Sequence, residues 1–473
     1  MAGLPSNRVL KPIPWLAGLG TGAIASTGPA GLLACVAVLL GIALLTMPET
    51  GVLAAVLLKP LVDCLWSLRV IPVAGTFLNL QSLVGIVLPV CLALALIRRR
   101  VTIRAEPIQV LLITYLVFTA IGIVRSPVRS AAVGDFGRIG FSVLFFWAGV
   151  LMSRTERSVR ILMWSLAAYG TVPVITAALQ LLGIVHPLTG SVRNPTDVIR
   201  LTGLYHHPLE IAMRASLAFP FGLALAGLVR APYVRRSLRA WSIVVGLASC
   251  ATLVRSALVA NLVQGWLWLV GRRRGLLSVG FVGLACLTGF LVPPLRTVFD
   301  SAVRPLREGA TYELATGRAL LFVAQVNAFG AASPTEKLLG RGLHSTPGVN
   351  VQFAPLAAID PSGEDFEEGN VGAHNQYLRV LTESGALGLA ALLGVIVYVM
   401  RASLRLRSSV IESDRAFAGG ALVAMVGVLI YGLSATPLDA PSIAWPFWLI
   451  GGVVTELHSA KGISAATPGV TQA

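Results

Sequence analysis

Long apolar runs alternate with short polar segments along nearly the whole chain. Each run has about 17 to 25 residues, the length that an α-helix needs to cross a lipid bilayer. We therefore expect an all-α fold, a polytopic transmembrane helical bundle with about 12 spans. The expected spans are residues 30–47, 78–97, 107–124, 135–152, 161–183, 208–229, 240–254, 256–271, 275–293, 376–400, 416–434 and 441–457. A further apolar stretch ending at Trp66 leaves the number of spans before residue 78 open.

One polar segment, residues 294–374, is far longer than an ordinary connection. Its stretch 312–329 is rich in leucine, valine and other good helix formers, which predicts a helix there. We expect this segment to form a partly helical extracytoplasmic loop. The chain then divides into N-terminal transmembrane helices at 1–293, the large loop at 294–374, and C-terminal transmembrane helices with a cytoplasmic tail at 375–473.

Charge supports this topology. The chain is 55% hydrophobic and 12% charged, about half the charged fraction of a typical soluble protein. Its basic residues are mostly arginines, and about half of them cluster in five short segments: 98–104, 154–160, 230–239, 272–274 and 401–415. These segments follow every second span, as the positive-inside rule requires of cytoplasmic loops. The net charge of +16 therefore indicates membrane orientation rather than nucleic-acid binding. Both chain ends are expected in the cytoplasm.

Metal, disulfide and leader signals are weak. The five cysteines lie in or beside apolar segments without paired spacing, which is typical of small buried side chains. The acidic run 364–368 contains no Asp-X-Asp pair, so we expect no metal site and no cofactor. The N-terminus shows no signal-peptide cleavage pattern, and the first spans are expected to remain in the mature protein.

Polar residues gather where the large loop enters the span 376–400. His374 and Asn375 stand at this boundary, where polar side chains usually serve a substrate or an ion. An imidazole can accept a proton near neutral pH, as an acceptor hydroxyl requires before it attacks a sugar carbon. The alternative is an interfacial histidine that is hydrogen-bonded to its own loop. His344 lies on the same outer side and is a second candidate.

Three arginines of the outer side lie beside or within apolar spans, and for Arg255 the positive-inside rule gives no reason. Arg200 ends a polar loop, Arg255 lies in a turn between two apolar helices, and Arg214 lies inside a span where it can pair with Glu210 at i, i+4. A guanidinium donates two parallel hydrogen bonds to phosphate oxygens, so converging arginines would hold a diphosphate. The alternatives are that Arg200 reaches the lipid headgroups and that Arg255 stabilises a helix end.

Several motifs together resemble one family. The pattern His374-Asn375, nine residues, Gly385, two residues, Gly388 resembles the signature of the O-antigen ligase and O-antigen polymerase superfamily. Further segments in the same order resemble its arginine segments and its large loop: Arg200-Leu201-Thr202-Gly203, Thr252-Leu253-Val254-Arg255-Ser256, Thr316-Gly317-Arg318 and Gly340-Arg341-Gly342. The resemblance covers about residues 195–390. Many members have Asn where this chain has Leu209.

The resemblance implies a GT-C-like membrane glycosyltransferase of the bacterial inner membrane, with its active site facing the periplasm. It implies an undecaprenyl-diphosphate-linked glycan donor and a glycan or lipid A-core acceptor. His374 would be the catalytic base, and Arg200 and Arg255 would bind the diphosphate. Candidate supporting residues are Asn375, Arg214, Arg318 and His344.

Two questions stay open from the sequence. A ligase and a polymerase differ in their acceptor, and neither the acceptor nor the sugar, the linkage or the oligomeric state follows from these residues. A transporter or flippase of lipid-linked sugars is the alternative from another class. It would predict broken helices, paired repeats and charges buried near the middle of the membrane.

Overall fold

The computed structural model describes residues 39–65, 69–73, 76–101, 106–185, 201–205, 207–272, 274–293, 296, 318–353, 372 and 374–466. It divides into two compact units, residues 1–99 and residues 100–473. The described residues are predominantly helical, which confirms the main feature of the expected fold.

The first unit contains helical residues 39–46, α2 (Pro48–Cys64), α3 (Leu80–Arg98) and a short hairpin. Strands β1 (Arg69–Val73) and β2 (Thr76–Asn79) pair antiparallel in this hairpin, which the apolar pattern does not predict. The α2 helix packs on α3. Within α2, Lys59 and Asp63 form a buried ion pair one turn apart, so neither charge is buried alone.

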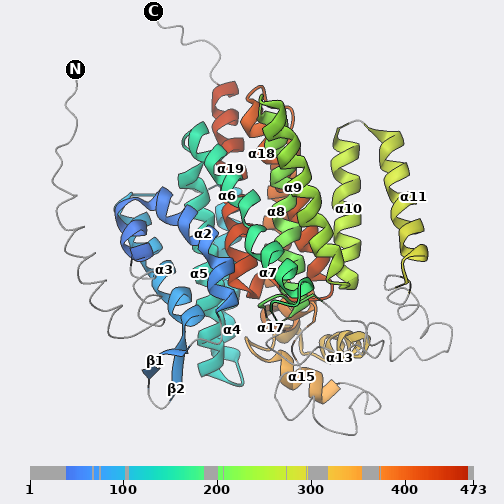
Figure 1. The fold of residues 1–473 in the computed structure, drawn as a ribbon. Helices are drawn as coiled ribbons and strands as arrows, with labels where there is room; N and C mark the ends of the chain where they lie inside the picture. The colour runs from blue at the N-terminus through green and yellow to red at the C-terminus, as the bar shows by residue number, and fades with distance from the viewer. Residues whose placement is uncertain are drawn as a thin grey trace, which may run out of the picture. The chain divides into compact units, whose positions relative to one another are not determined.

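The second unit contains most of the helices (Figure 1). They are α4 (Pro107–Arg125), α5 (Arg129–Met152), α6 (Glu156–Ala168), α7 (Thr171–Leu181), α8 (Pro208–Leu228), α9 (Pro232–Ala251), α10 (Arg255–Gly271), α11 (Gly275–Leu291), α13 (Arg318–Gly330), α14 (Pro334–Leu339), α15 (Thr346–Phe353), α17 (Gln376–Leu406), α18 (Glu412–Gly432), the 3₁₀ helix η3 (Pro437–Asp439) and α19 (Pro441–Ala466). The predicted helix over 312–329 is present from Arg318 onward as α13, and residues 312–317 lie outside the described residues.

Six helical segments in the described part of the chain are long and apolar enough to cross a membrane. They are α4, α5, α8, α17, α18 and the segment Glu156–Leu181, which comprises α6 and α7. The chain therefore has the fold of a multi-pass membrane protein. Helices α3, α9, α10, α11 and α19 coincide with further expected spans. The total of about 12 spans stays a prediction.

Close helix packing comes from small residues. A Cβ on Gly149 of α5 would lie 2.2 Å from the carbonyl oxygen of Leu449 in α19, and a Cβ on Gly452 would meet Phe146 in the same way. Glycine therefore lets these two backbones approach, as is common between helices in membranes. Phe145 and Trp445 stack beside them with ring centroids 4.6 Å apart.

Helices α10 and α18 define the two ends of the second unit. Gln264 of α10 donates to the carbonyl of Val423 in mid-α18 over 2.9 Å, and Arg407, just before α18, donates to Gly271 at the end of α10. The two helices therefore run in opposite directions. The start of α10, the end of α18 and the start of α17 share one end with α13, α14 and α15, here called the cap end (Figure 1). The turn between α10 and α11 lies at the opposite end.

Candidate functional site at the cap end

The start of α17 is held in place by its own polar residues. Asn375 is the N-cap, and its side-chain oxygen accepts from the backbone N–H groups of Tyr377 and Leu378 at 2.9 and 3.0 Å. Its side-chain nitrogen donates to the carbonyl of Leu433, 3.2 Å away, at the end of α18. His374 immediately precedes this cap and is partly exposed. Asn375 therefore fixes the backbone beside the predicted base.

Two further contacts anchor the first turn of α17. The side-chain oxygen of Gln376 accepts from the backbone N–H of Leu438 in η3 at 3.1 Å. The hydroxyl of Tyr377 donates to the carbonyl of Leu429 in α18 at 2.9 Å. The polar residues after His374 in the sequence thus join α17 to α18 and η3.

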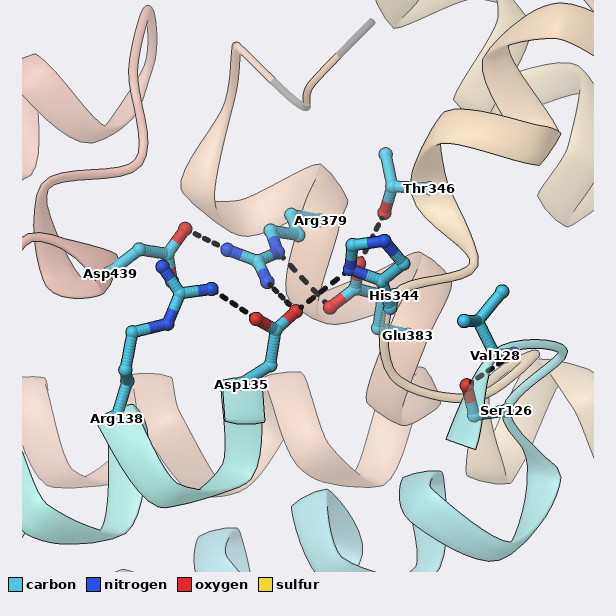
Figure 2. Close-up of polar contacts among 9 residues, drawn as sticks. All are labelled: Ser126, Val128, Asp135, Arg138, His344, Thr346, Arg379, Glu383 and Asp439. Carbon is cyan, nitrogen blue, oxygen red and sulfur yellow. Dashed lines mark hydrogen bonds and ion pairs between the residues drawn. The ribbon is translucent and has the colours of Figure 1, made fainter. Parts of the chain in front are cut away.

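A buried ionic cluster lies one turn further into α17 (Figure 2). Arg379 donates to Asp135 of α5 at 3.1 Å, to Glu383 of its own helix at 3.0 Å, and to Asp439 of η3. Its side chain is 14% exposed. A buried charge is stable only when it is paired, and Arg379 has three partners from three elements. We call Asp135, Arg138, His344, Arg379, Glu383 and Asp439 the Arg379 cluster.

Asp135 connects this cluster to a histidine. Its carboxylate accepts from Arg138 as well as from Arg379, and it lies 3.2 Å from Nδ1 of His344. In the cluster three carboxyl groups face two guanidinium groups, and His344 adjoins the carboxylate that both guanidinium groups contact. A carboxylate that holds one imidazole nitrogen fixes the orientation of the ring and of its other nitrogen. His344 is 40% exposed at its side chain, so this nitrogen can meet a ligand.

A break in α17 brings His344 to Asp135. Gly385 has φ +70° inside α17. At this break the carbonyls of Thr382 and Glu383 accept hydrogen bonds from outside the helix. Their donors are the backbone N–H groups of Arg341 and Gly342, at 2.8 and 3.2 Å. The segment 340–343 from the large loop thus docks in the break, and His344 follows it directly. His344 has φ +62°, a strained conformation that is often retained at functional sites.

The glycines of the predicted motifs make this docking possible. A Cβ on Gly385 would lie 2.2 Å from the carbonyl oxygen of Leu338, and a Cβ on Gly340 would lie 2.4 Å from that of Glu383. Both glycines also have positive φ, which other residues rarely adopt. Thr346 completes the contact through a 2.8 Å hydrogen bond to Glu383. The glycine part of the motif therefore has a packing role.

Arg255 is the first residue of α10, at the cap end. It follows a tight turn in which Leu253 has φ +54° and the hydroxyl of Thr252 donates to the carbonyl of Ser249 at 2.7 Å. Ser249 in turn donates to the carbonyl of Ala212 in α8 at 3.1 Å. The side chain of Arg255 is partly exposed at this turn.

Arg214 is buried in α8 and forms the predicted i, i+4 ion pair with Glu210, 3.0 Å from Nη1 to Oε2. Its guanidinium carbon also lies 4.4 Å from the centre of the Tyr205 ring, a cation–π contact. Arg214 therefore holds the segment before α8 against that helix.

His374 and Asn375 stand at the start of α17, Arg255 is the first residue of α10, Arg214 lies in the first third of α8, and His344 lies beside Asp135 near the start of α5. Arg200 lies outside the described residues, as does the side chain of Arg318 at the start of α13.

No role was predicted from the sequence for the carboxylates of the Arg379 cluster. The sequence could have indicated Asp135 and Glu383, because acidic residues inside apolar spans are rare and usually mark a functional site. Asp439 had no such signal, since it lies in a short polar turn.

No family model matches the chain, and a comparison with curated proteins finds no match either. The class that the fold supports is that of a multi-pass helical membrane protein with a buried ionic cluster near one end.

Proposed function

We propose that the chain is an integral membrane glycosyltransferase of the bacterial inner membrane. It would transfer or polymerise glycans from an undecaprenyl-diphosphate-linked donor at the periplasmic face, with about 12 spans and the cap end outside. The observation that supports the proposal is that candidates for both roles lie at the cap end: His374 next to its N-cap Asn375, Arg255 at the start of α10 after its strained turn, and His344 beside Asp135. An imidazole can act as the base, and a guanidinium as the phosphate ligand, that the reaction needs.

In the proposed reaction, His374 accepts the proton of an acceptor sugar hydroxyl. The freed oxygen attacks the anomeric carbon of the donor with inversion, and the bond from that carbon to the diphosphate oxygen breaks. Arg200 and Arg255 stabilise the negative charge on the departing undecaprenyl diphosphate. The donor already carries a good leaving group, so the proposal requires neither a metal nor a nucleotide.

One observation favours the alternative, a transporter of lipid-linked sugars, because α17 is broken at Gly385. However, Arg379 is the fourth residue of α17 and Asp135 the seventh of α5. At 1.5 Å per residue both lie within about 10 Å of a helix start. Charges of a transport site are expected near the middle of the membrane instead. The break also has a partner from the loop, which gives it a docking role.

The test is reconstitution of the purified protein with a lipid-linked repeat unit, with and without lipid A-core. A ladder of products identifies a polymerase, and a shifted core band identifies a ligase. We expect His374→Ala to abolish transfer while its thermal unfolding midpoint stays that of the wild type. His458→Ala is the matched control. His458 is also a partly exposed histidine, but it lies in the second half of α19 and not among the cap-end residues.

Four results would contradict the proposal or one of its parts. Full transfer by His374→Ala removes the assigned base, and loss with His344→Ala alone would move this role to His344. Loss of transfer in EDTA would overturn the metal-free reaction. Movement of the lipid-linked sugar across the vesicle membrane without any glycan product would support the transporter.

A further inference from the structure

A cavity of about 290 Å³ opens at the end opposite to the cap. It lies between the ends of α8 and α10, the start of α18, and the turn between α17 and α18. Among the residues that the structure describes, three arginines line it: Arg272, Arg407 and Arg415. Its volume is close to the lower limit for small-molecule sites, about 300 Å³.

The guanidinium groups are held in place by small and aromatic neighbours. Arg407 donates to the carbonyl of Gly271 at 2.9 Å, and a Cβ on Gly271 would lie 2.5 Å from the same nitrogen. Arg272 lies over the ring of Trp268, 4.9 Å from its centre, and a Cβ on Gly227 would lie 3.0 Å from its Nη2. The two glycines make room for both arginines beside the helices.

The cavity carries excess positive charge. Among its described lining residues the one carboxylate is that of Glu412, which lies 3.9 Å from Arg415. Burial lowers the pKa of Arg272, and so does repulsion from further arginines, namely Arg239, Arg274, Arg407 and Arg415. Gathering like charges in one place is costly unless an anion balances them. The positive-inside rule accounts for arginines at this end, but not for their position around a cavity.

The remaining walls are apolar and come from Ala224, Leu228, Leu267, Leu422 and Val423. A cavity with arginines at the helix ends and apolar walls along the helices matches an amphiphile whose phosphate is attached to acyl chains. A free phosphate would use the arginines but leave these walls without a partner. Basic pockets between membrane helices on the cytoplasmic side bind the headgroups of anionic lipids in this way.

We propose that this cavity is a binding site for the phosphate group of an anionic phospholipid of the cytoplasmic leaflet. The arginines bind the phosphate oxygens, and an acyl chain lies along the apolar wall. The site requires the chain to be in a membrane with this end at a leaflet surface. It does not depend on glycosyl transfer at the cap end.

Native mass spectrometry of the purified protein in detergent tests the site. The probes are phosphatidylglycerol, cardiolipin and phosphatidylcholine, with inorganic phosphate in a separate arm. We expect binding of the two anionic lipids in preference to phosphatidylcholine. Each arginine removed should weaken this binding about five-fold, since a basic residue near a lipid surface contributes about that factor.

Two variants separate charge from volume. Arg272→Gln with Arg415→Gln removes two charges and leaves the Arg407 hydrogen bond intact, and Arg157→Gln is the control on an exposed arginine near the start of α6, outside the cavity. Gly419→Leu fills the cavity without changing its charge. A Cβ on Gly419 meets nothing within 4 Å, so there is space for the larger side chain. We expect Gly419→Leu to weaken anionic lipid binding at least as much as the double variant.

Three outcomes would overturn the proposal. If Arg157→Gln weakens lipid binding as much as the double variant, the attraction is that of the general surface charge. If Gly419→Leu binds like the wild type, the lipid lies elsewhere. If inorganic phosphate binds at the arginines and the lipids do not, the site takes a soluble anion. Unfolding midpoints in phosphatidylcholine identify any variant that has lost its fold. The double variant is then replaced by the single Arg415→Gln change, and Gly419→Leu by the smaller Gly419→Val change.

Discussion

Replacing Arg379 with Met should destabilise the protein far more than the same change at Arg138. Both arginines contact Asp135, but the side chain of Arg379 is 14% exposed and that of Arg138 is 55% exposed. Arg379→Met leaves three carboxylates near one another without their shared counter-ion. Breaking a buried ion pair in this way costs about 3 to 5 kcal/mol, whereas an exposed pair contributes about 0 to 1 kcal/mol.

A double-mutant cycle with Asp439→Asn measures the coupling. Asp439→Asn alone leaves Arg379 with two carboxylates, and we expect a loss of about 1.5 to 3 kcal/mol, typical of a hydrogen bond to a charged group. The double variant should lose less than the two single losses added, by about 0.5 to 3 kcal/mol. Denaturant unfolding in detergent, followed by tryptophan fluorescence, gives these free energies. Equal, small losses for Arg379→Met and Arg138→Met would refute the assignment of a buried cluster.

Three further changes test the parts around the site. Gly385→Ala should cost at least about 1 to 3 kcal/mol in unfolding free energy, because φ +70° is strained for alanine, whereas Gly419→Ala in an open helical position should be neutral or stabilising by up to about 1 kcal/mol. Ser333→Ala removes the capping box of α14 and should cost about 1 kcal/mol locally, seen as faster hydrogen exchange of this helix. Hydrogen bonds from Ser333 lower the pKa of Glu336. The protection of the α14 amides from hydrogen exchange should therefore be complete above the ordinary glutamate pKa and be lost as pH falls through the lowered value. Constant protection of these amides down to pH 2 would contradict this. Gln264→Leu removes two donors to helix carbonyls and should cost about 1 to 3 kcal/mol in the same unfolding assay, and no loss would show that these bonds contribute little.

The apolar pattern alone predicted most of the helices. Spans of this length can satisfy their backbone hydrogen bonds in lipid only as helices, so the pattern determines the element type almost without reference to packing. The same reasoning located the polar boundary at His374 and Asn375, because a polar group is costly there. It did not predict the hairpin of β1 and β2, whose strands are too short for a periodic signal.

The sequence also indicated local pairs within one helix. Arg214 and Glu210 stand four residues apart, and helix geometry alone brings them together, as the structure shows. The glycines of the motif were visible as well, but their role was not. Gly340 and Gly385 lie far apart in the chain, and it takes their close approach to explain why neither can carry a side chain.

The sequence by itself therefore determined the helical class, the polar boundary and the contacts within single helices, because these depend on neighbours along the chain. Tertiary structure alone decided that Arg379 meets Asp135 and Asp439, that His344 docks through the break at Gly385, and that scattered arginines surround one cavity. Such contacts join residues that are dozens to hundreds of positions apart. They depend on which helix faces pack together, and the spacing of residues in one sequence carries no record of that choice.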